Sequence, residues 1–209
     1  SFFRQLAIGN RIWKIGSGEM FNQQLINVIA NNIDSTHTCI VSLGIASLSE
    51  SQQIIEHLST ATNQIVVMDC LSQYPCSIRD YETTRWTTIK AQYPHYDFGL
   101  SDHSGTIWPT IYSWQYGATW NEFHITFDKN MFGLDQKASL DPSQLSILSQ
   151  SRNAYESLHQ NQTIDNRSYV PDMKRKFGRS LGVVSSFKRG HKLSSSDFLL
   201  RKPAGGDYS

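Results

Sequence analysis

Apolar and polar residues follow one another in a repeating order along roughly the first 160 residues of the chain. Short runs rich in β-branched and aromatic residues are each followed by turn residues and then by apolar positions at helical spacing. Several of these runs are apolar throughout, which is typical of strands covered on both faces. Five strand–loop–helix units in succession predict a parallel α/β domain, either an open sheet or a barrel. The predicted strands are 11–15, 39–43, 65–70, 97–101 and 120–126.

Helix signals separate these strands. Ser49 and Gln52 have the spacing of a capping box ahead of an apolar run. Pro109 suits a first helical turn, and Asp141-Pro142 is typical of an N-cap followed by proline at the first helical position.

The pattern changes near residue 159. The following stretch is polar and predicts a linker. Short β-type runs around a Lys-Arg-Gly turn then indicate the start of a small second domain. We therefore expect a domain at 1–159, a linker at 160–178 and the beginning of a second domain at 179–209.

Composition narrows the classes of function. The chain has 209 residues and a formal net charge of +1, with 19 Lys and Arg against 18 Asp and Glu. It contains no long basic run, so we do not expect a nucleic-acid partner. No apolar run reaches membrane-spanning length, so we expect no membrane partner either. Three cysteines fit neither a zinc motif nor a disulfide framework, which favours a reducing, cytoplasmic location.

Polar side chains gather where each predicted strand ends. In parallel α/β folds the carboxyl ends of the strands share one edge, where loops converge and ligands bind. Five strand ends in register are a more specific signal of a site than any single motif. The residues concerned are Lys14, Ser17, Glu19, Ser42, Ser72, Tyr74, Ser101, Asp102, His103, Glu122 and His124.

Ser101-Asp102-His103 has the residue types of a Ser-His-Asp triad without its geometry. Side chains alternate along a strand, so Ser101 and His103 are expected on one face and Asp102 on the other. A catalytic relay needs groups from separate segments, and the chain has no G-x-S-x-G elbow. His103 and His124 end consecutive strands, about 4.8 Å apart, and could share a divalent metal ion. Two hydrogen-bonded structural histidines are the alternative.

Structural roles that involve no ligand are also possible for Lys14, Ser17 and Glu19. A lysine in an apolar run needs a partner, which is either an acid or a bound anion. Ser17-Gly18 before a helix suits a phosphate or carboxylate, but it is equally an ordinary turn. Glu19 can be an acid favoured by the helix dipole.

Taken in order, the motifs resemble the sialic acid synthase family. The barrel-like matches are WKIGSGEM, IVSLGIASLSE, DCLSQYP, FGLSDHSG and NEFHITFDKNMFGLDQKASLDPSQL. The segment RSLGVVSSFKRGHKLSSSDFLLRKP resembles the opening of the family's antifreeze-like (SAF) domain. The resemblance implies a TIM (β/α)8 barrel, of which this chain supplies the last five β/α units, followed by an incomplete SAF domain. The first three units, with a glutamate and a lysine of the active site, are expected to precede Ser1.

The resemblance also implies residue roles. The amino sugar is expected to contact Glu19 and Tyr74, with Glu19 as a candidate for proton transfer. His103 and His124 are expected to bind Mn²⁺ or Mg²⁺. Phosphoenolpyruvate is expected to bind Lys14, Ser17, Ser42, Ser72 and Ser101, and Lys14 is also a catalytic candidate. Supporting roles are expected for Asp102, Glu122 and Asp135.

Two positions depart from the family pattern. The family's SAF domain carries an arginine that reaches the sugar site of the partner subunit. Here Lys202 stands directly before Pro203 in its place, with Arg201 one residue earlier. Lysine does not reproduce the planar fork of arginine. Leu134 replaces the proline of the family's Gly-Pro-Asp segment.

The activity implied is the condensation of phosphoenolpyruvate, an N-acylated amino sugar such as N-acetylmannosamine, and water. The products are phosphate and a nine-carbon 2-keto acid, which is sialic, legionaminic or pseudaminic acid. The full-length parent is expected to be a homodimer that exchanges SAF domains. The 209-residue piece alone is expected to be inactive, because five of eight units leave open sheet edges. The alternatives are a different phosphoenolpyruvate–sugar condensing barrel acting on a phosphorylated aldose, and a non-catalytic degenerate barrel with a binding or structural role.

Overall fold

The computed structural model describes residues 10–160 and 168–204, and the chain divides into two compact units between Ser157 and Leu158. Residues 161–167 of the expected linker and the last five residues of the expected second domain lie outside the described residues.

The first unit is a six-stranded sheet with helices between its strands. Its strands are β1 (Ile12–Ile15), β2 (Thr38–Ser42), β3 (Gln64–Cys70), β4 (Asp97–Asp102), β5 (Ala118–Ile125) and β6 (Ser139–Leu140). Its α-helices are α2 (Gln23–Ala30), α3 (Leu48–Ser59), α4 (Thr83–Gln92), α5 (Trp108–Ser113) and α6 (Pro142–Gln160). Short 3-10 helices cover Ser17–Glu19, Ile78–Asp80, Trp114–Tyr116 and Gln136–Ala138.

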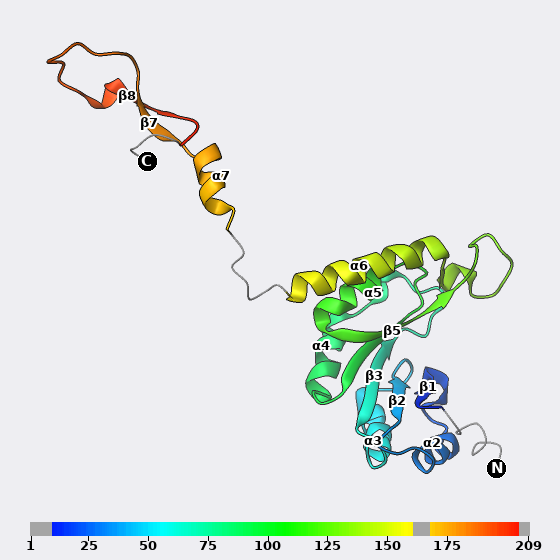
Figure 1. Ribbon diagram of the computed structural model, residues 1–209. Coiled ribbons are helices and arrows are strands. Elements are labelled where there is room, and N and C mark those ends of the chain that lie inside the picture. Colours follow the sequence, from blue (N-terminus) through cyan, green and yellow to red (C-terminus); the bar gives the residue numbers. More distant parts are fainter. Residues whose placement is uncertain (1–9, 161–167, 205–209) are drawn as a thin grey trace. The chain divides into compact units, whose positions relative to one another are not determined.

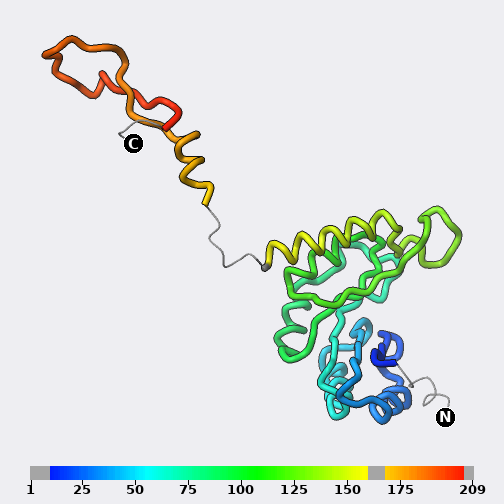
Figure 2. Tube along the Cα trace, viewed as in Figure 1, coloured from blue at the N-terminus to red at the C-terminus, as the bar shows by residue number. Residues whose placement is uncertain are grey.

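The strand order decides between an open sheet and a barrel. All six strands are parallel, and each pairs with the strand that follows it in sequence. Right-handed crossovers without a reversal of strand order keep the helices on one face and curl the sheet around the other. Figure 1 shows this curl, with the helices outside, and the trace in Figure 2 passes through the strands in sequence order. The unit is a partial TIM barrel, as the family resemblance implies.

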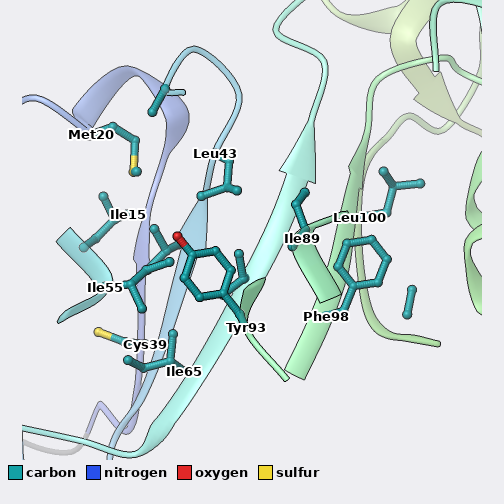
Figure 3. Close-up of a cluster of buried hydrophobic side chains, with 14 of the residues drawn as sticks. Ile15, Met20, Cys39, Leu43, Ile55, Ile65, Ile89, Tyr93, Phe98 and Leu100 are labelled. Atoms are coloured by element: carbon teal, nitrogen blue, oxygen red, sulfur yellow. The ribbon is translucent and has the colours of Figure 1, made fainter. Parts of the chain in front are cut away.

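The main core fills the space between the sheet and the helices. Ile15, Val41 and Leu100 point outward from their strands and are fully buried. Figure 3 shows such strand residues packed against Ile55 of α3 and Ile89 of α4. Each fully buried aliphatic side chain of this kind contributes about 1.5–3 kcal/mol to stability.

A smaller apolar layer lies on the inner face of the curled sheet. Ile40, Val66 and Met68 pack there with Trp120 of β5. Gly99 of β4 allows the close approach of Trp120, because a Cβ atom at position 99 would lie 2.9 Å from the Trp120 carbonyl oxygen and 3.0 Å from the Trp120 Cβ atom. This layer lines part of the inner face of the sheet, next to the polar strand ends.

One predicted detail was wrong, and one strand was missed. The α3 capping box is formed by Ser47 and Glu50, two residues before the predicted pair at Ser49 and Gln52. The correct pair satisfies the backbone N–H groups of both residues, whereas Ser49 already lies in the first helical turn. The sequence also gave no sign of β6, because two residues are too short for an alternation pattern.

The second unit contains α7 (Val170–Phe177), followed by the antiparallel strands β7 (Ser180–Val183) and β8 (Phe198–Arg201). The expected linker at 160–178 therefore contains a helix in its described part. A proline at its first turn and basic residues in its last turn explain why a polar segment is helical there. Gly190 ends the expected Lys-Arg-Gly turn with a positive φ of 95°.

Candidate functional site

A polar cluster occupies the inner face where β1, β4 and β5 end. Lys14 Nζ lies 2.9 Å from Glu122 Oε1, and Ser101 Oγ donates to the same oxygen atom at 2.7 Å. Lys14 and Glu122 are each about one-third exposed, with 36% of the side-chain surface accessible. The carboxylate of Glu122 thus holds an ammonium and a hydroxyl group at the open end of the barrel.

His103 lies beside this cluster, and a hydrogen bond from one ring nitrogen determines its tautomer. Its Nδ1 is 2.8 Å from the carbonyl oxygen of Leu71, which only accepts, so Nδ1 carries the proton. Nε2 then presents a lone pair to Ser101 Oγ at 3.3 Å. The Ser101 proton is directed to the carboxylate of Glu122, which is the stronger acceptor. The Nε2 lone pair therefore faces the inner side without a donor among the described residues.

Burial lowers the pKa of His103 below its ordinary value. The hydrogen bond to Leu71 opposes this shift, and the neighbouring imidazole of His124 adds to it. The imidazole is therefore neutral at pH 7, which is the form that ligates metals.

His124 and Tyr74 complete the aromatic part of the site. The His103 and His124 rings are 5.3 Å apart between centroids. Tyr74 lies 4.2 Å from the His103 ring and meets His124 edge-on at 5.5 Å. Asp135 Oδ2 is 3.8 Å from His124 Nδ1, which is within ion-pair range but beyond hydrogen-bond distance.

Serine hydroxyl groups approach one another where β1, β2 and β3 end. Ser17 Oγ lies 3.1 Å from Ser72 Oγ. Gly44 allows this approach, because a Cβ atom there would lie 2.4 Å from the Ser17 Cβ atom. Ser42, at the end of β2, is 1% exposed, and its hydroxyl has no hydrogen-bond partner among the described residues. An unpaired buried hydroxyl is unfavourable, which makes Ser42 a candidate for pairing with a ligand after a small local movement.

Asp102 faces away from this site. Its carboxylate accepts hydrogen bonds from Tyr81, Thr110 and the Ser104 backbone, and none from His103. Ser101 and His103 share the inner face, as strand alternation predicts. The triad interpretation is therefore excluded by geometry as well as by spacing.

Glu19 and Lys202 are among the predicted site residues that no hydrogen bond or ion pair joins to the cluster in the described structure. Glu19 accepts a hydrogen bond from Asn22 Nδ2 at 2.7 Å. Lys202 is exposed after β8 in the second unit, and Arg201 pairs with Ser180 across the β7–β8 hairpin. Their roles stay predictions.

Sequence reasoning gave Glu122 only a supporting role, whereas it connects β1, β4 and β5. Alternation with His124 could have placed it on the inner face, but its distance from Lys14 depends on the curl of the sheet. Tyr81 was missed entirely, because nothing in its local sequence marks a contact with Asp102.

The residues present fit a divalent metal ion with two protein ligands. The lone pair of His103 Nε2 and the adjacent imidazole of His124 are suited to Mn²⁺ or Mg²⁺ if oxygen atoms from water or substrate complete the shell. The part of the chain that the structure describes holds no cluster of three or more His, Cys, Asp and Glu residues with the arrangement of a metal site. Among the described residues, His103 and His124 are the candidate ligands for such an ion.

A separate cavity of about 500 Å³ lies between β5 and α6, on the outer side of the sheet. Three of its charged and amide groups already have partners: Arg152 pairs with Glu156 at 2.6 Å, and Asn121 accepts from Trp114 at 2.8 Å. We therefore assign the candidate site to the strand ends and not to this cavity.

A family model described as NeuB family matches residues 3–163. The chain therefore belongs to the NeuB family. The N,N'-diacetyllegionaminic acid synthase of Campylobacter jejuni subsp. jejuni is 28% identical over 203 residues, covering 95% of this chain. The N-acetylneuraminate-9-phosphate synthase of Drosophila melanogaster is 23% identical over 219 residues, covering 92% of this chain.

Among solved structures, the N-acetylneuraminic acid (sialic acid) synthetase of Leptospira borgpetersenii serovar Hardjo-bovis, in complex with citrate, superposes with a TM-score of 0.67. It is 25% identical and covers 80% of this chain. The chain spans 59% and 58% of the two curated relatives and 57% of this structure. In the described residues, no helix combines the length and the apolar character that a membrane crossing requires.

Proposed function

We propose that the carboxyl ends of the strands in this chain form part of an active site. This site condenses phosphoenolpyruvate with an N-acylated amino sugar. The observation that carries the proposal is the convergence of Lys14, Ser101, Glu122 and His103 from three different strands on one inner edge. The relatives differ in the sugar acid that their names specify, so the proposal covers the class of amino sugars. It applies to a full-length parent, meaning a protein of the relatives' length that contains this sequence.

Lys14 is the cation for the phosphate and carboxylate groups of phosphoenolpyruvate. Glu122 supports this role, because it holds the ammonium group at the open strand end without covering it. Ser17 and Ser72 add hydroxyl donors, and the unpaired hydroxyl of Ser42 is a third. Ser101 becomes a fourth donor when its proton turns from Glu122 to the ligand. Hydrogen bonds from a charged donor to an anion are shorter and stronger than neutral ones, so Lys14 is expected to dominate affinity.

His103 and His124 are the proposed holders of Mn²⁺ or Mg²⁺. The Nδ1 contact with Leu71 supports this role by fixing the tautomer of His103. A divalent ion bound there supplies Lewis-acid polarisation of the sugar carbonyl oxygen. Tyr74 lies against both imidazoles and is placed to form one wall of the sugar subsite.

In the proposed reaction, C3 of phosphoenolpyruvate forms a bond to the aldehyde carbon of the open-chain sugar. Water adds at C2, and the C2–O bond to phosphate then breaks, so that one phosphate leaves for each 2-keto acid formed. Glu19 is the proposed proton-transfer group. Lys14 offsets the negative charge of the phosphoryl group throughout.

The second unit is proposed to dock on the barrel of a partner subunit, with Lys202 directed to the sugar. Charge supports this arrangement: residues 168–204 contain nine Lys and Arg against two Asp, a formal charge of +7. Residues 10–160 contain eight against fourteen Asp and Glu, a formal charge of −6. Opposite net charges favour association of the two kinds of surface.

The 209-residue chain alone is proposed to be inactive. In the described structure β1 pairs only with β2, and β5 pairs with β6 through only His124 and Ile125. Open strand edges on both sides leave the inner face without a complete wall.

The test is product formation from [2-¹³C]phosphoenolpyruvate by the full-length parent, followed by ¹³C NMR. N-acetylmannosamine, a diacetamido-dideoxy hexose and a phosphorylated aldose are offered in parallel with Mn²⁺. A labelled nine-carbon 2-keto acid from either amino sugar supports the proposal. Product from the phosphorylated aldose alone identifies the rival condensing enzyme, and no product from any of the three favours a non-catalytic barrel.

A further inference from the structure

Asp102, at the end of β4, and His103, directly after it, hold the ten-residue segment 71–80 at two points and Tyr81, the next residue, at a third. The segment after β3, residues 71–80, contains Ser72 and Tyr74, and its residues 72–75 are exposed. Burial therefore contributes little to fixing their positions. The His103 ring is bonded to the Leu71 carbonyl at 2.8 Å, and the His103 carbonyl accepts from the Cys76 backbone at 3.1 Å.

The third point is a buried carboxylate on the outer side of β4. Asp102 is 2% exposed, and its Oδ1 accepts from the Tyr81 hydroxyl at 2.8 Å and from the Ser104 backbone at 2.8 Å. Its Oδ2 accepts from Thr110 at 3.1 Å. The Tyr81 hydroxyl also lies 3.1 Å from Cys76 Sγ. Asp102 thus connects the far end of the segment, the end of β4 and helix α5.

We propose that Asp102 and Tyr81 are positioning residues, which keep Tyr74 against His103 and keep His103 at its place on the inner face. The inference rests on the proposed function only in treating His103 as a metal ligand. Asp102 itself faces away from the site, so it acts through the residues on either side of it and through the 71–80 segment. Removing the Tyr81 hydroxyl or the Asp102 charge releases the far end of the segment, and Tyr74 then loses its fixed contact.

The chain offers a matched control in Asp69. This carboxylate stands at the end of β3, is 3% exposed, faces outward, and accepts from Trp86 and Arg85 at 2.8 Å each. It holds helix α4 and makes no contact with the 71–80 segment in the described structure. Its donor Trp86 meets the Tyr81 ring edge-on at 6.1 Å between centroids. Asp69→Asn therefore reports what the loss of a buried strand-end carboxylate does when neither Tyr81 nor the 71–80 segment is among its hydrogen-bond donors.

The test uses the 209-residue chain with Tyr81→Phe, Asp102→Asn and Asp69→Asn. In metal-free protein, NOE contacts between the Tyr74 and His103 rings and the ¹⁵N shifts of the His103 imidazole report the arrangement directly. Mn²⁺ affinity is measured separately by calorimetry. We expect Tyr81→Phe and Asp102→Asn to weaken the ring contact at least twofold and to raise the Mn²⁺ Kd about 10- to 100-fold, as outer-sphere changes do. Asp69→Asn is expected to leave both unchanged.

Unchanged ring contacts and Mn²⁺ affinity in Tyr81→Phe and Asp102→Asn would overturn the inference. Equal losses in Asp69→Asn would also overturn it, because they would assign the effect to stability. If Asp102→Asn does not fold, the milder Tyr81→Phe decides alone. Absence of Mn²⁺ binding by the wild-type chain would count against the proposed metal site, while the NOE comparison would still decide the positioning role.

Discussion

Lys14 and Glu122 are 2.9 Å apart, although they come from the first and fifth strands of the sheet. Strands this far apart in a flat sheet cannot bring their side chains into contact, because neighbouring strands are already about 4.8 Å apart. The ion pair therefore depends on the curl of the sheet. It places one cation and one anion across the open end of the barrel, where a ligand must bind between or beside them.

Lys14→Met should weaken phosphoenolpyruvate binding while changing the stability of the fold very little. Both partners of the ion pair are about one-third exposed, so the unfolding free energy should fall by at most about 1 kcal/mol. Phosphoenolpyruvate affinity of the full-length parent should fall about 10- to 100-fold, because a hydrogen bond to a charged group is worth about 1.5–3 kcal/mol. Calorimetric titration and urea unfolding measure the two effects. Lys90→Met, on the exposed side of α4, is the control and should change neither.

His103→Ala and His124→Ala should each weaken Mn²⁺ binding at least about tenfold, because each removes one of two protein ligands. The measurement is Mn²⁺ titration followed by electron paramagnetic resonance of the free ion. His95→Ala removes an exposed histidine that precedes β4, away from the carboxyl strand ends. This variant should leave Mn²⁺ binding unchanged. Normal binding by both site variants would leave His103 and His124 as structural histidines.

His103 should make stability depend on pH in a defined direction. Burial lowers its folded-state pKa below the ordinary 6.5, so the unfolded chain binds more protons in the window between the two values. The contribution of neutral His103 to the free energy of unfolding is complete above about pH 6.5. It is lost as the pH falls through that window. Urea unfolding from about pH 7.5 to 5 should therefore show a steeper loss for wild type than for His103→Gln. A His103 pKa of 6.5 or more by NMR titration would contradict this account.

The structure and the sequence prediction place the capping box of α3 at different serines, and mutation of each serine tests which is correct. Ser47→Ala should destabilise the chain by about 0.5–2 kcal/mol, because the Ser47 hydroxyl and backbone both pair with Glu50. Ser49→Ala, at the predicted cap, should change stability by less than about 0.5 kcal/mol. Chemical denaturation of the two variants measures the difference. A larger loss in Ser49→Ala would favour the sequence prediction.

Much of the fold was predictable because strands covered on both faces leave a strong local signal. The five predicted strands begin and end within two residues of β1 to β5. The polar strand ends were predictable for the same reason, since parallel strands share one carboxyl edge. Strand alternation was enough to separate Ser101 and His103 from Asp102.

The contacts that could not be predicted from the sequence depend on how the sheet curls and on the paths of its loops. The pairing of Lys14 with Glu122 needs the curvature of the whole sheet, and the Tyr81–Asp102 contact needs the path of a loop. Ser47 and Ser49 both have an acid or amide three positions later, so only the helix start itself distinguishes the two caps.

The central claim is that the strand-end cluster around Lys14 handles phosphoenolpyruvate. The most direct measurement is amino-sugar-dependent phosphate release from phosphoenolpyruvate by the full-length parent, compared among wild type, Lys14→Met and Lys90→Met. We predict release that requires the amino sugar, persists in Lys90→Met and falls at least about tenfold in kcat/KM in Lys14→Met. Release that is independent of the sugar, or equal in Lys14→Met and wild type, would contradict the account.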